Sequence, residues 1–262
     1  MNEQCQRWRS GRASYRPAGE PLVPRQYGVE LVDEQTARDF VVEHHYSRSY
    51  PAARRRAGLF RAGRGLVGVA VFSVPLQPAA IRKHAGVAAS AGVELGRFVL
   101  LDEEPSNSET WFLARAFGLL RAELPDVAAV LAYADPLARE TADGQLVKPG
   151  HVGTIYKAHN GRLAGRSSPR TLLLGPDGRA LNGRALTKIR REERGTAYAE
   201  RQLVEMGGPK RMQGESGESY VRRALATGPF RRVAHPGNLA YVWPLRRPRS
   251  MAGRAECPTI TR

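Results

Sequence analysis

The chain has 262 residues, a length that suits one large domain or one domain with extensions. Its net charge of +16 favours a polyanionic partner, with nucleic acid as the first candidate. We expect no membrane span and no membrane partner, because the sequence has no run of about 18 apolar residues. The two cysteines have neither metal-knuckle nor disulfide spacing, and the N-terminus lacks the apolar segment of a signal peptide. We therefore expect an intracellular protein without a cysteine-based metal site.

The first half of the chain alternates helical and extended patterns. Residues 1–27 are polar, contain scattered Pro and Gly, and are expected to form a flexible basic arm. Asp33 is a candidate N-cap for a helix that starts there and runs to about residue 47. The later patterns predict two strands around a turn within 57–75, a strand at 92–101, a helix at 108–124 and a central strand at 126–136.

The second half is more basic. A short helix is expected within 150–165, a hairpin at 170–181, a charged helix at 187–206 and one more strand at 238–245. Together the elements predict an α/β fold with a mixed central sheet flanked by helices. Residues 186–262 contain 16 basic and 7 acidic residues, and form a basic C-terminal extension that we expect to dock partly on the core.

An acid-free span follows the first predicted helix. Residues 44–93 contain eight Lys or Arg residues and neither Asp nor Glu. We expect Arg54, Arg55 and Arg56 to lie in a loop, where flexible guanidinium groups reach backbone phosphates. The alternative is an ordinary solvated basic surface.

Four polar sites stand out, each with two interpretations. His45 and Tyr46 form a competent proton-transfer pair, or His45 only caps the helix C-terminus. Arg97, among apolar residues of a strand, either reaches solvent at an edge or holds an anionic group. Asp135 ends a buried strand, as a turn former or as a carboxylate where ligands of open α/β sheets bind. Tyr156 opens a polar stretch, with Lys157 and Asn160, that is either a surface helix or part of a site.

Common nucleotide and acyl-donor motifs are absent from the sequence. There is no P-loop, no GxGxxG opening a helix and no HExxH. The position of the acyl-CoA loop of GNAT acetyltransferases reads "DEEPSNSET", which contains no glycine and carries acids that would repel a pyrophosphate. An ordinary acetyltransferase is therefore disfavoured.

Five motifs in order resemble the Mom family of phage DNA-modification proteins over about residues 28–185. They are "HHYS", "LGRFVL", the "NS" before the long helix, "AYADP" and "HVGTIYKAHNGRLAG". The resemblance implies a GNAT-like fold for residues 28–185. It also implies transfer of a carbamoylmethyl (acetamido) type group to adenine N6 in double-stranded DNA, which protects the DNA from restriction endonucleases. The family has an aromatic "N-W" after its helix tyrosine, whereas this chain reads "HNGRL".

The resemblance also implies roles for matching residues. Asp135 is the candidate general base, with His45 as the alternative, and Tyr46 or Tyr156 protonates the leaving group or stacks on the base. Arg97 holds the anionic part of the donor, and the serine before the long helix corresponds to Ser108. The further candidate residues for substrate binding are Lys157 and Asn160, and those for DNA binding are Arg54, Arg55, Arg56, Arg190 and Arg191.

The donor is not identified by the sequence, and acetyl-CoA or another acyl-CoA is its candidate. The expected location is the cytoplasm of a bacterial host cell. Two other functions stay open: a GNAT-type acyltransferase that acts on tRNA or a protein amine, and a non-enzymatic phage protein that binds nucleic acid.

Overall fold

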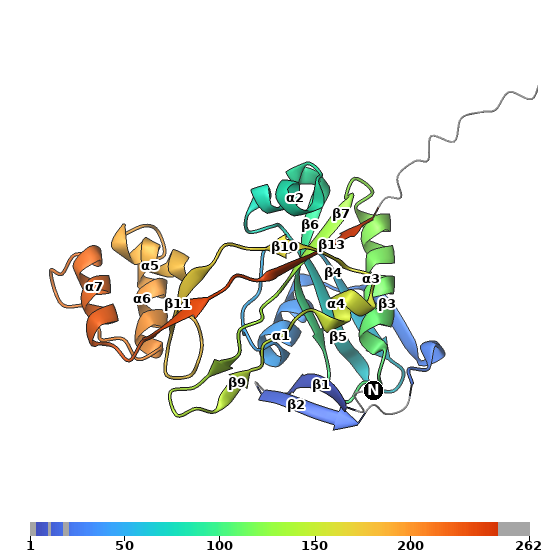
Figure 1. Cartoon of the computed structure of the whole chain (residues 1–262), viewed down its shortest axis with the longest axis horizontal. Helices are drawn as coiled ribbons and strands as arrows, with labels where there is room; N and C mark the ends of the chain where they lie inside the picture. The colour runs from blue at the N-terminus through green and yellow to red at the C-terminus, as the bar shows by residue number, and fades with distance from the viewer. Residues whose placement is uncertain (1–3, 10–11, 18–20, 246–262) are drawn as a thin grey trace, which may run out of the picture.

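A computed structural model describes residues 4–9, 12–17 and 21–245 of the chain. Its body is a seven-stranded sheet covered by helices, and a small helical unit stands apart from that body (Figure 1). None of the helices in these ranges is long and apolar enough to cross a lipid bilayer.

The sheet has the strand order β10-β13-β7-β6-β5-β4-β3. β6 and β7 are parallel, and all other neighbours in this sheet are antiparallel. A mixed sheet flanked by helices confirms the predicted fold class, and the strands predicted within 57–75, 92–101, 126–136 and 238–245 are all present. The seven strands are β3 (Tyr27–Leu31), β4 (Ala53–Arg61), β5 (Gly65–Ser73), β6 (Gly92–Leu100), β7 (Ala129–Ala134), β10 (Arg162–Arg166) and β13 (Leu239–Pro244).

Helices cover both faces of the sheet, and for this reason β5 and β7 are apolar along nearly their whole length. α1 (Glu34–His44) and α2 (Pro78–Ala85) pack on one face, where Val41 and Ile81 are fully buried. α3 (Ser108–Glu123) covers the other face, with α4 (Thr154–Ala158) beside it. The predicted Asp33 cap of α1 is confirmed by its bond from the Thr36 amide, at 2.9 Å. α2 is an element that the sequence patterns did not predict.

The parallel strands β6 and β7 pair over a short distance only. Residues 92–94 of β6 are in register with 129–131 of β7, and beyond them no pairing between these two strands is found within the described residues. Arg97 lies in the remaining part of β6, and Asp135 follows directly after β7. Arg97 and Asp135 thus lie where the β6–β7 ladder has ended, although β6 stays paired with β5 and β7 with β13.

β13 lies inside the sheet, between β10 and β7, although it comes from the end of the described chain. It was predicted as a single further strand that docks on the core. Tyr241 is fully buried and Trp243 is 5% exposed, so the strand carries a large share of the core. The segment 186–262 is therefore not an extension as a whole.

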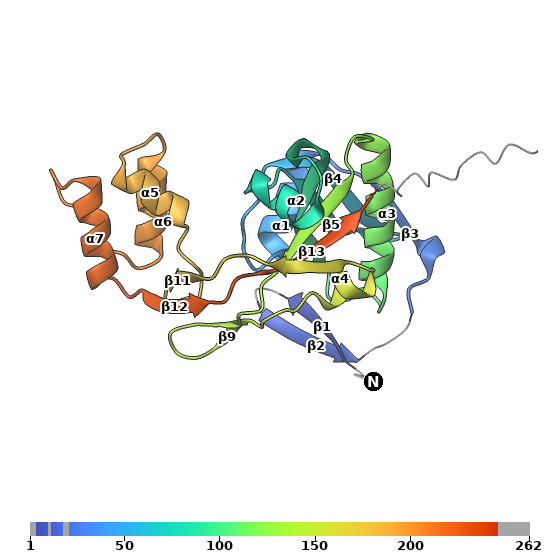
Figure 2. The ribbon, with the colours of Figure 1, turned by 45° about the horizontal axis from the view of Figure 1, so that its top comes forward.

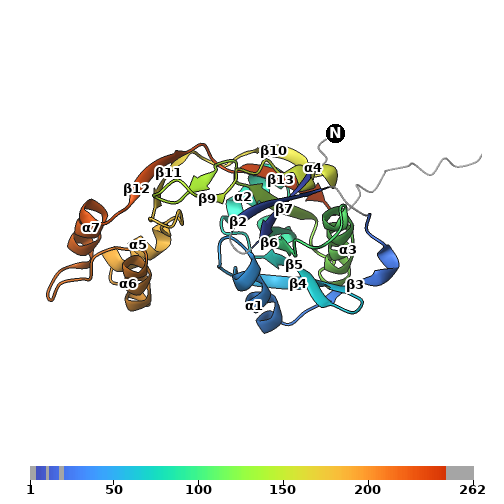
Figure 3. The same ribbon diagram turned by 90° about the horizontal axis from the view of Figure 1, so that it is seen from below.

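A two-stranded ribbon leaves the body and carries the helical unit (Figures 2 and 3). The ribbon pairs β11 (Arg170–Leu174) with β12 (Arg231–His235). The unit itself consists of α5 (Gly183–Arg190), α6 (Thr196–Glu205) and α7 (Gly217–Thr227) around its own apolar cluster. The predicted hairpin at 170–181 is a short turn closed by the Leu174–Ala180 bridge and by a bond from the Leu181 amide to the Leu173 carbonyl, while β11 forms its ladder with β12.

The single charged helix predicted at 187–206 is wrong. Residues 191–195 separate α5 from α6, since Glu192 and Gly195 have φ angles of 52° and 89° and so leave the helical region. The predicted arm, 1–27, contains a hairpin of β1 (Gln4–Arg9) and β2 (Arg12–Pro17). The small sheet of β8 (Arg139–Glu140) and β9 (Leu146–Lys148) lies against β2.

Candidate functional site

His45 and Tyr46 follow the last turn of α1. The His45 amide closes the helix on the Val41 carbonyl at 2.9 Å, and the chain then turns away from the helix axis. The two rings lie with centroids 4.2 Å apart, and both side chains keep partial exposure. The structure therefore presents this predicted pair side by side at the end of a rigid helix.

A chain of hydrogen bonds leads from Arg97 to His45. The Arg97 guanidinium donates to the Ser49 hydroxyl at 2.7 Å and to the Ser49 carbonyl at 2.8 Å. The Ser49 hydroxyl donates to the Ser47 hydroxyl at 3.2 Å, and the Ser47 hydroxyl lies 2.8 Å from Nδ1 of His45. Arg97 can only donate, and the Ser49 hydroxyl donates to that of Ser47, so the chain of hydrogen bonds runs from Arg97 toward His45.

The same contacts determine the tautomer of His45. The backbone N–H of Ser47 points at Nδ1 from 3.1 Å, and a backbone N–H can only donate. Nδ1 is therefore the acceptor, and the neutral ring carries its proton on Nε2. Burial, followed by the charges of Arg97 and His151, lowers the pKa of His45 to about 3, so the ring is neutral at physiological pH.

Asp135 is held by donors on both carboxylate oxygens. Oδ1 accepts from the Leu137 amide at 3.0 Å and from Nε2 of His235 at 2.9 Å. Oδ2 lies 2.6 Å from the Arg139 guanidinium and 3.3 Å from Nζ of Lys148. Although burial opposes ionisation, Lys148, His235 and Arg139 together hold the pKa of Asp135 well below its usual value. Both oxygens of Asp135 are therefore engaged by donors, and the residue holds this part of the site together; its role as general base stays a prediction.

His235 reaches Asp135 from the distant ribbon. Its Nδ1 accepts from the Gly237 amide at 2.9 Å, so its proton is on Nε2 and is donated to Asp135. The two residues are 100 positions apart in the chain. No local sequence pattern could have indicated this partner.

Lys148 is buried beside Asp135 and carries a charge there. Its ammonium has three acceptors, namely the carbonyl oxygens of Asp135 and Leu137, at 3.1 and 2.9 Å, and Oδ2 of Asp135. Burial lowers the pKa of Lys148 to about 8, while Asp135 favours the charged form. With three acceptors for its three protons, the ammonium form persists at neutral pH. Lys148 also lies 5.7 Å from the ring centroid of Tyr46, which joins Asp135 to the pair at the end of α1.

Tyr156 closes the other side of this group. It is 6% exposed, and its ring lies 5.4 Å from Trp243 and 6.0 Å from His151. Gly153 lets α4 approach the sheet this closely, since a Cβ at this position would lie 2.5 Å from the Tyr241 ring. Burial, then the neighbouring Tyr46, raises the pKa of Tyr156 above its ordinary value, so the phenol stays protonated.

We call these residues the polar cluster. The predicted residues interact electrostatically. The charges of Arg139, Asp135 and Arg97 act on the pKa of Tyr46, and Tyr46 and Arg97 act on the pKa of Tyr156. Four members of the polar cluster were not predicted from the sequence: Arg139, Lys148 and His235 lie outside the five motifs, and His151 opens the last motif but was not singled out. The polar cluster consists of His45, Tyr46, Arg97, Asp135, Arg139, Lys148, His151, Tyr156 and His235.

Three predicted substrate-binding residues lie outside the polar cluster. Ser108 is fully buried, and its hydroxyl donates to the Pro105 carbonyl at 2.7 Å. Lys157 and Asn160 are exposed at the end of α4. Their roles in substrate binding stay predictions.

The expected loop for Arg54, Arg55 and Arg56 is wrong, because all three lie in β4. Arg55 pairs with Glu123 at 3.2 Å, and Arg56 with Glu34 at 3.6 Å. Long aliphatic stems allow arginines to lie along a sheet and reach partners at its margins. These guanidinium groups are therefore held by the protein itself. Arg190 and Arg191 lie far along the chain, at the end of α5, where Arg190 pairs with Glu218 at 3.7 Å.

The loop before α3 does not fit the pyrophosphate of an acyl-CoA donor. Asp102 and Glu103 precede the helix and Glu109 lies in its first turn, whereas Glu104 is buried and paired with Arg61. Carboxylates at a helix N-terminus repel the anion that the helix dipole would otherwise attract. We therefore assign no catalytic step to coenzyme A.

The fold and the polar cluster define an α/β protein that has a mixed sheet with helices on both faces and a cationic site beside the end of strand β7. The chain belongs to the Mom protein family, whose family model matches residues 26–215. This match extends beyond residue 185, where the resemblance was predicted to end, and includes α5 and α6.

One curated relative is the methylcarbamoylase mom of Escherichia phage Mu, which is 30% identical over 138 residues. The alignment covers 52% of this chain and 52% of the relative, so the chain spans about half the length of that protein.

Two solved structures have a weak similarity to the chain. One is a tandem GNAT protein from the clavulanic acid biosynthesis pathway, with a TM-score of 0.45, 9% identity, and coverage of 85% of this chain and 99% of that one. The other is a spermidine/spermine N-acetyltransferase from Vibrio cholerae, with a TM-score of 0.33, 11% identity, and coverage of 55% and 82%. Likeness at this level says nothing about the reaction.

Proposed function

We propose that the protein is a transferase that attaches a carbamoylmethyl (acetamido) type group to N6 of adenine in double-stranded DNA. In a bacterial host cell, with its cytoplasm as the site of action, this modification would protect the DNA from restriction endonucleases. Membership of the Mom family supports the proposal, together with similarity to the methylcarbamoylase of phage Mu. The observation that carries it is the polar cluster, which gathers the histidine, tyrosines, arginine and aspartate of the shared motifs from separate segments of the chain.

The reaction requires removal of one proton. The N6–carbon bond forms while the bond between the carbon and the donor's leaving group breaks, and the leaving group takes that electron pair. N6 is a poor nucleophile because its lone pair is delocalised into the ring, and its hydrogen becomes acidic as the new bond forms. A residue that accepts this proton at the right moment therefore accelerates transfer.

We assign proton transfer to Ser47 and His45 on geometric grounds, because the Ser47 hydroxyl lies against the accepting Nδ1 of His45, whereas both carboxylate oxygens of Asp135 already accept from donors of the protein. In this scheme the Ser47 hydroxyl takes the N6 proton as its own proton passes to Nδ1 of His45, 2.8 Å away. The resulting imidazolium holds a second proton on Nε2, from which the leaving group can be protonated. Asp135 supports the site by fixing Lys148 and Arg139.

Arg97 is the proposed anchor for the anionic part of the donor. Its hydrogen bonds go to neutral oxygens of Ser49 and Gly96, so its charge is available to an incoming anion. The target adenine must leave the duplex to reach a cluster at this depth, which costs a few kcal/mol. Contacts with the phosphate backbone would have to offset that cost.

The test is mass spectrometry of nucleosides from the DNA of cells that express the protein. Wild-type protein is expected to convert deoxyadenosine into a derivative with an acetamido substituent on N6. Unmodified DNA together with acylated tRNA or protein amines would support an acyltransferase. If neither kind of modification is found, a non-enzymatic protein that binds nucleic acid is the remaining function.

Ser47→Ala is expected to lower the modification rate by about 10² or more, the typical contribution of general-base catalysis. Ser47→Thr keeps the hydroxyl and should restore most of the activity. The matched control is Ser168→Ala, an exposed serine outside the polar cluster. Wild-type rates in Ser47→Ala would contradict the proton path, and the affinity for DNA should be the same in all four proteins.

A further inference from the structure

The helical unit has an apolar core of its own. Leu186, Ile189, Leu203, Tyr220 and Val221 are at most 5% exposed and pack together between the three helices. The apolar faces of α5, α6 and α7 are thereby used inside the unit. Among its described residues only Tyr198 and Met212 are large exposed hydrophobic residues. The surface of the unit is thus defined by its charged side chains.

Internal ion pairs use up most of the acids of the unit. Residues 183–232 contain twelve Lys or Arg and six Glu residues. Four arginines pair with five of the six glutamates. The pairs are Arg184 with Glu193, Arg190 with Glu218, Arg211 with Glu192 and Glu200, and Arg223 with Glu215.

Eight cations and one acid therefore stand outside these pairs within the described residues. Most of the eight side chains are exposed, including Arg191 and Arg194 in the turn between α5 and α6, Arg201 on α6 and Arg222 on α7. Such an excess on one small unit repels itself unless an anion is present, so it favours a polyanionic partner.

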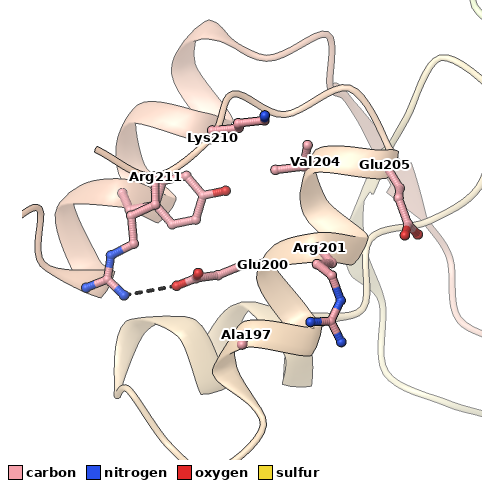
Figure 4. A pocket seen from close by; sticks show the side chains of 8 residues that line it. Ala197, Glu200, Arg201, Val204, Glu205, Lys210 and Arg211 are labelled. Carbon is pink, nitrogen blue, oxygen red and sulfur yellow. Dashed lines mark hydrogen bonds and ion pairs between the residues drawn. The ribbon is translucent and has the colours of Figure 1, made fainter. Parts of the chain in front are cut away.

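The cavity of the unit is lined both by a cation from these ion pairs and by cations outside them (Figure 4). About 460 Å³ in volume, it is lined by Arg211 and Glu200, which are bonded at 2.9 Å, and by Arg201 and Lys210. Arg201 extends away from the bonded pair in Figure 4. The pair belongs to the scaffold of the unit, and Arg201 is directed outward.

We propose that the helical unit is a separate binding surface for the phosphate backbone of double-stranded DNA. It holds the duplex independently of sequence while the polar cluster acts on the base. The choice of DNA as the polyanion rests on the proposed function, whereas the charge argument does not. An anionic membrane fits less well, because no helix of the unit has an apolar face left for the bilayer.

The experiment compares two full-length variants with equal loss of charge. In the first, Arg191, Arg194, Arg201 and Arg222 are replaced by Gln. In the control, Gln replaces four exposed cations of the body, namely Arg82 and Lys83 on α2 and Arg115 and Arg121 on α3. Affinity for a random-sequence duplex is measured over a range of salt concentrations, and circular dichroism verifies that both variants are folded.

Each lost phosphate contact reduces the slope of log K against log[salt] by about 0.9. We expect the helical-unit variant to lose a slope of about 2 to 4 and at least tenfold in affinity at low salt. The control is expected to change the slope by less than about 1, since its cations make no proposed contact.

Equal slope changes in the two variants would overturn the proposal. So would tighter binding of the wild-type protein to phosphatidylserine vesicles than to duplex DNA. This test does not depend on the reaction. If DNA binding depends on the helical unit but no modified deoxyadenosine is formed, the proposed function is refuted and the proposed DNA-binding surface is supported.

Discussion

Replacing Asp135 with Asn is expected to abolish modification and also to destabilise the protein by about 3–5 kcal/mol, the typical cost of breaking a buried ion pair from one side. The four groups around the carboxylate, from Leu137, Arg139, Lys148 and His235, are all hydrogen-bond donors. An amide would turn its own NH2 group toward at least one of these donors. Lys148 would also stay buried without its counter-charge.

Urea unfolding followed by circular dichroism measures this loss. Asp143→Asn is the control, because Asp143 is an exposed aspartate eight positions along the chain and its change should leave unfolding unaltered. An Asp135→Asn variant as stable as wild type would show that the Asp135 contacts do not hold the site together.

The pH dependence of stability has a definite sign. Because the pKa of Asp135 is lowered on folding, its contribution is fully present above the unfolded value of about 3.9 and is lost as pH falls below it. His45 adds to acid sensitivity at higher pH. Its lowered pKa means that the unfolded chain binds a proton first, from about pH 6.5 downward.

A chain that ends at residue 236 is expected to lose cooperative unfolding. It lacks β13, which bonds to β7 on one side and to β10 on the other. It also lacks Tyr241 and Trp243, and the loss of each buried aromatic side chain costs about 3–5 kcal/mol. Together these losses are comparable to the whole free energy of unfolding of a typical protein, about 5–15 kcal/mol.

A chain that ends at residue 245 is the matched control. It retains the whole of β13, so it should unfold as cooperatively as the full-length protein in a urea titration followed by circular dichroism. A protein that ends at residue 236 and shows the same transition would mean that the sheet is complete without β13.

Several elements were predictable because their causes are local. The Asp33 cap, the apolar spacing of α3 and the apolar runs of β5 and β7 each depend on neighbours within a few residues. The failures have local causes too. Glycine and a left-handed turn interrupt the helix predicted at 187–206, and the arginines at 54–56 suit a strand because their stems lie along the sheet.

The sequence by itself determined the α/β class, the basic character and the motif residues His45, Tyr46, Arg97, Asp135 and Tyr156. Only the tertiary structure decided what these residues do to one another. His235 and Lys148 reach Asp135 from the ribbon and from β9, and they engage both of its carboxylate oxygens. The physical reason is that the ionisation of a buried group depends on charges and donors within a few ångströms, and folding brings those together from distant parts of the chain.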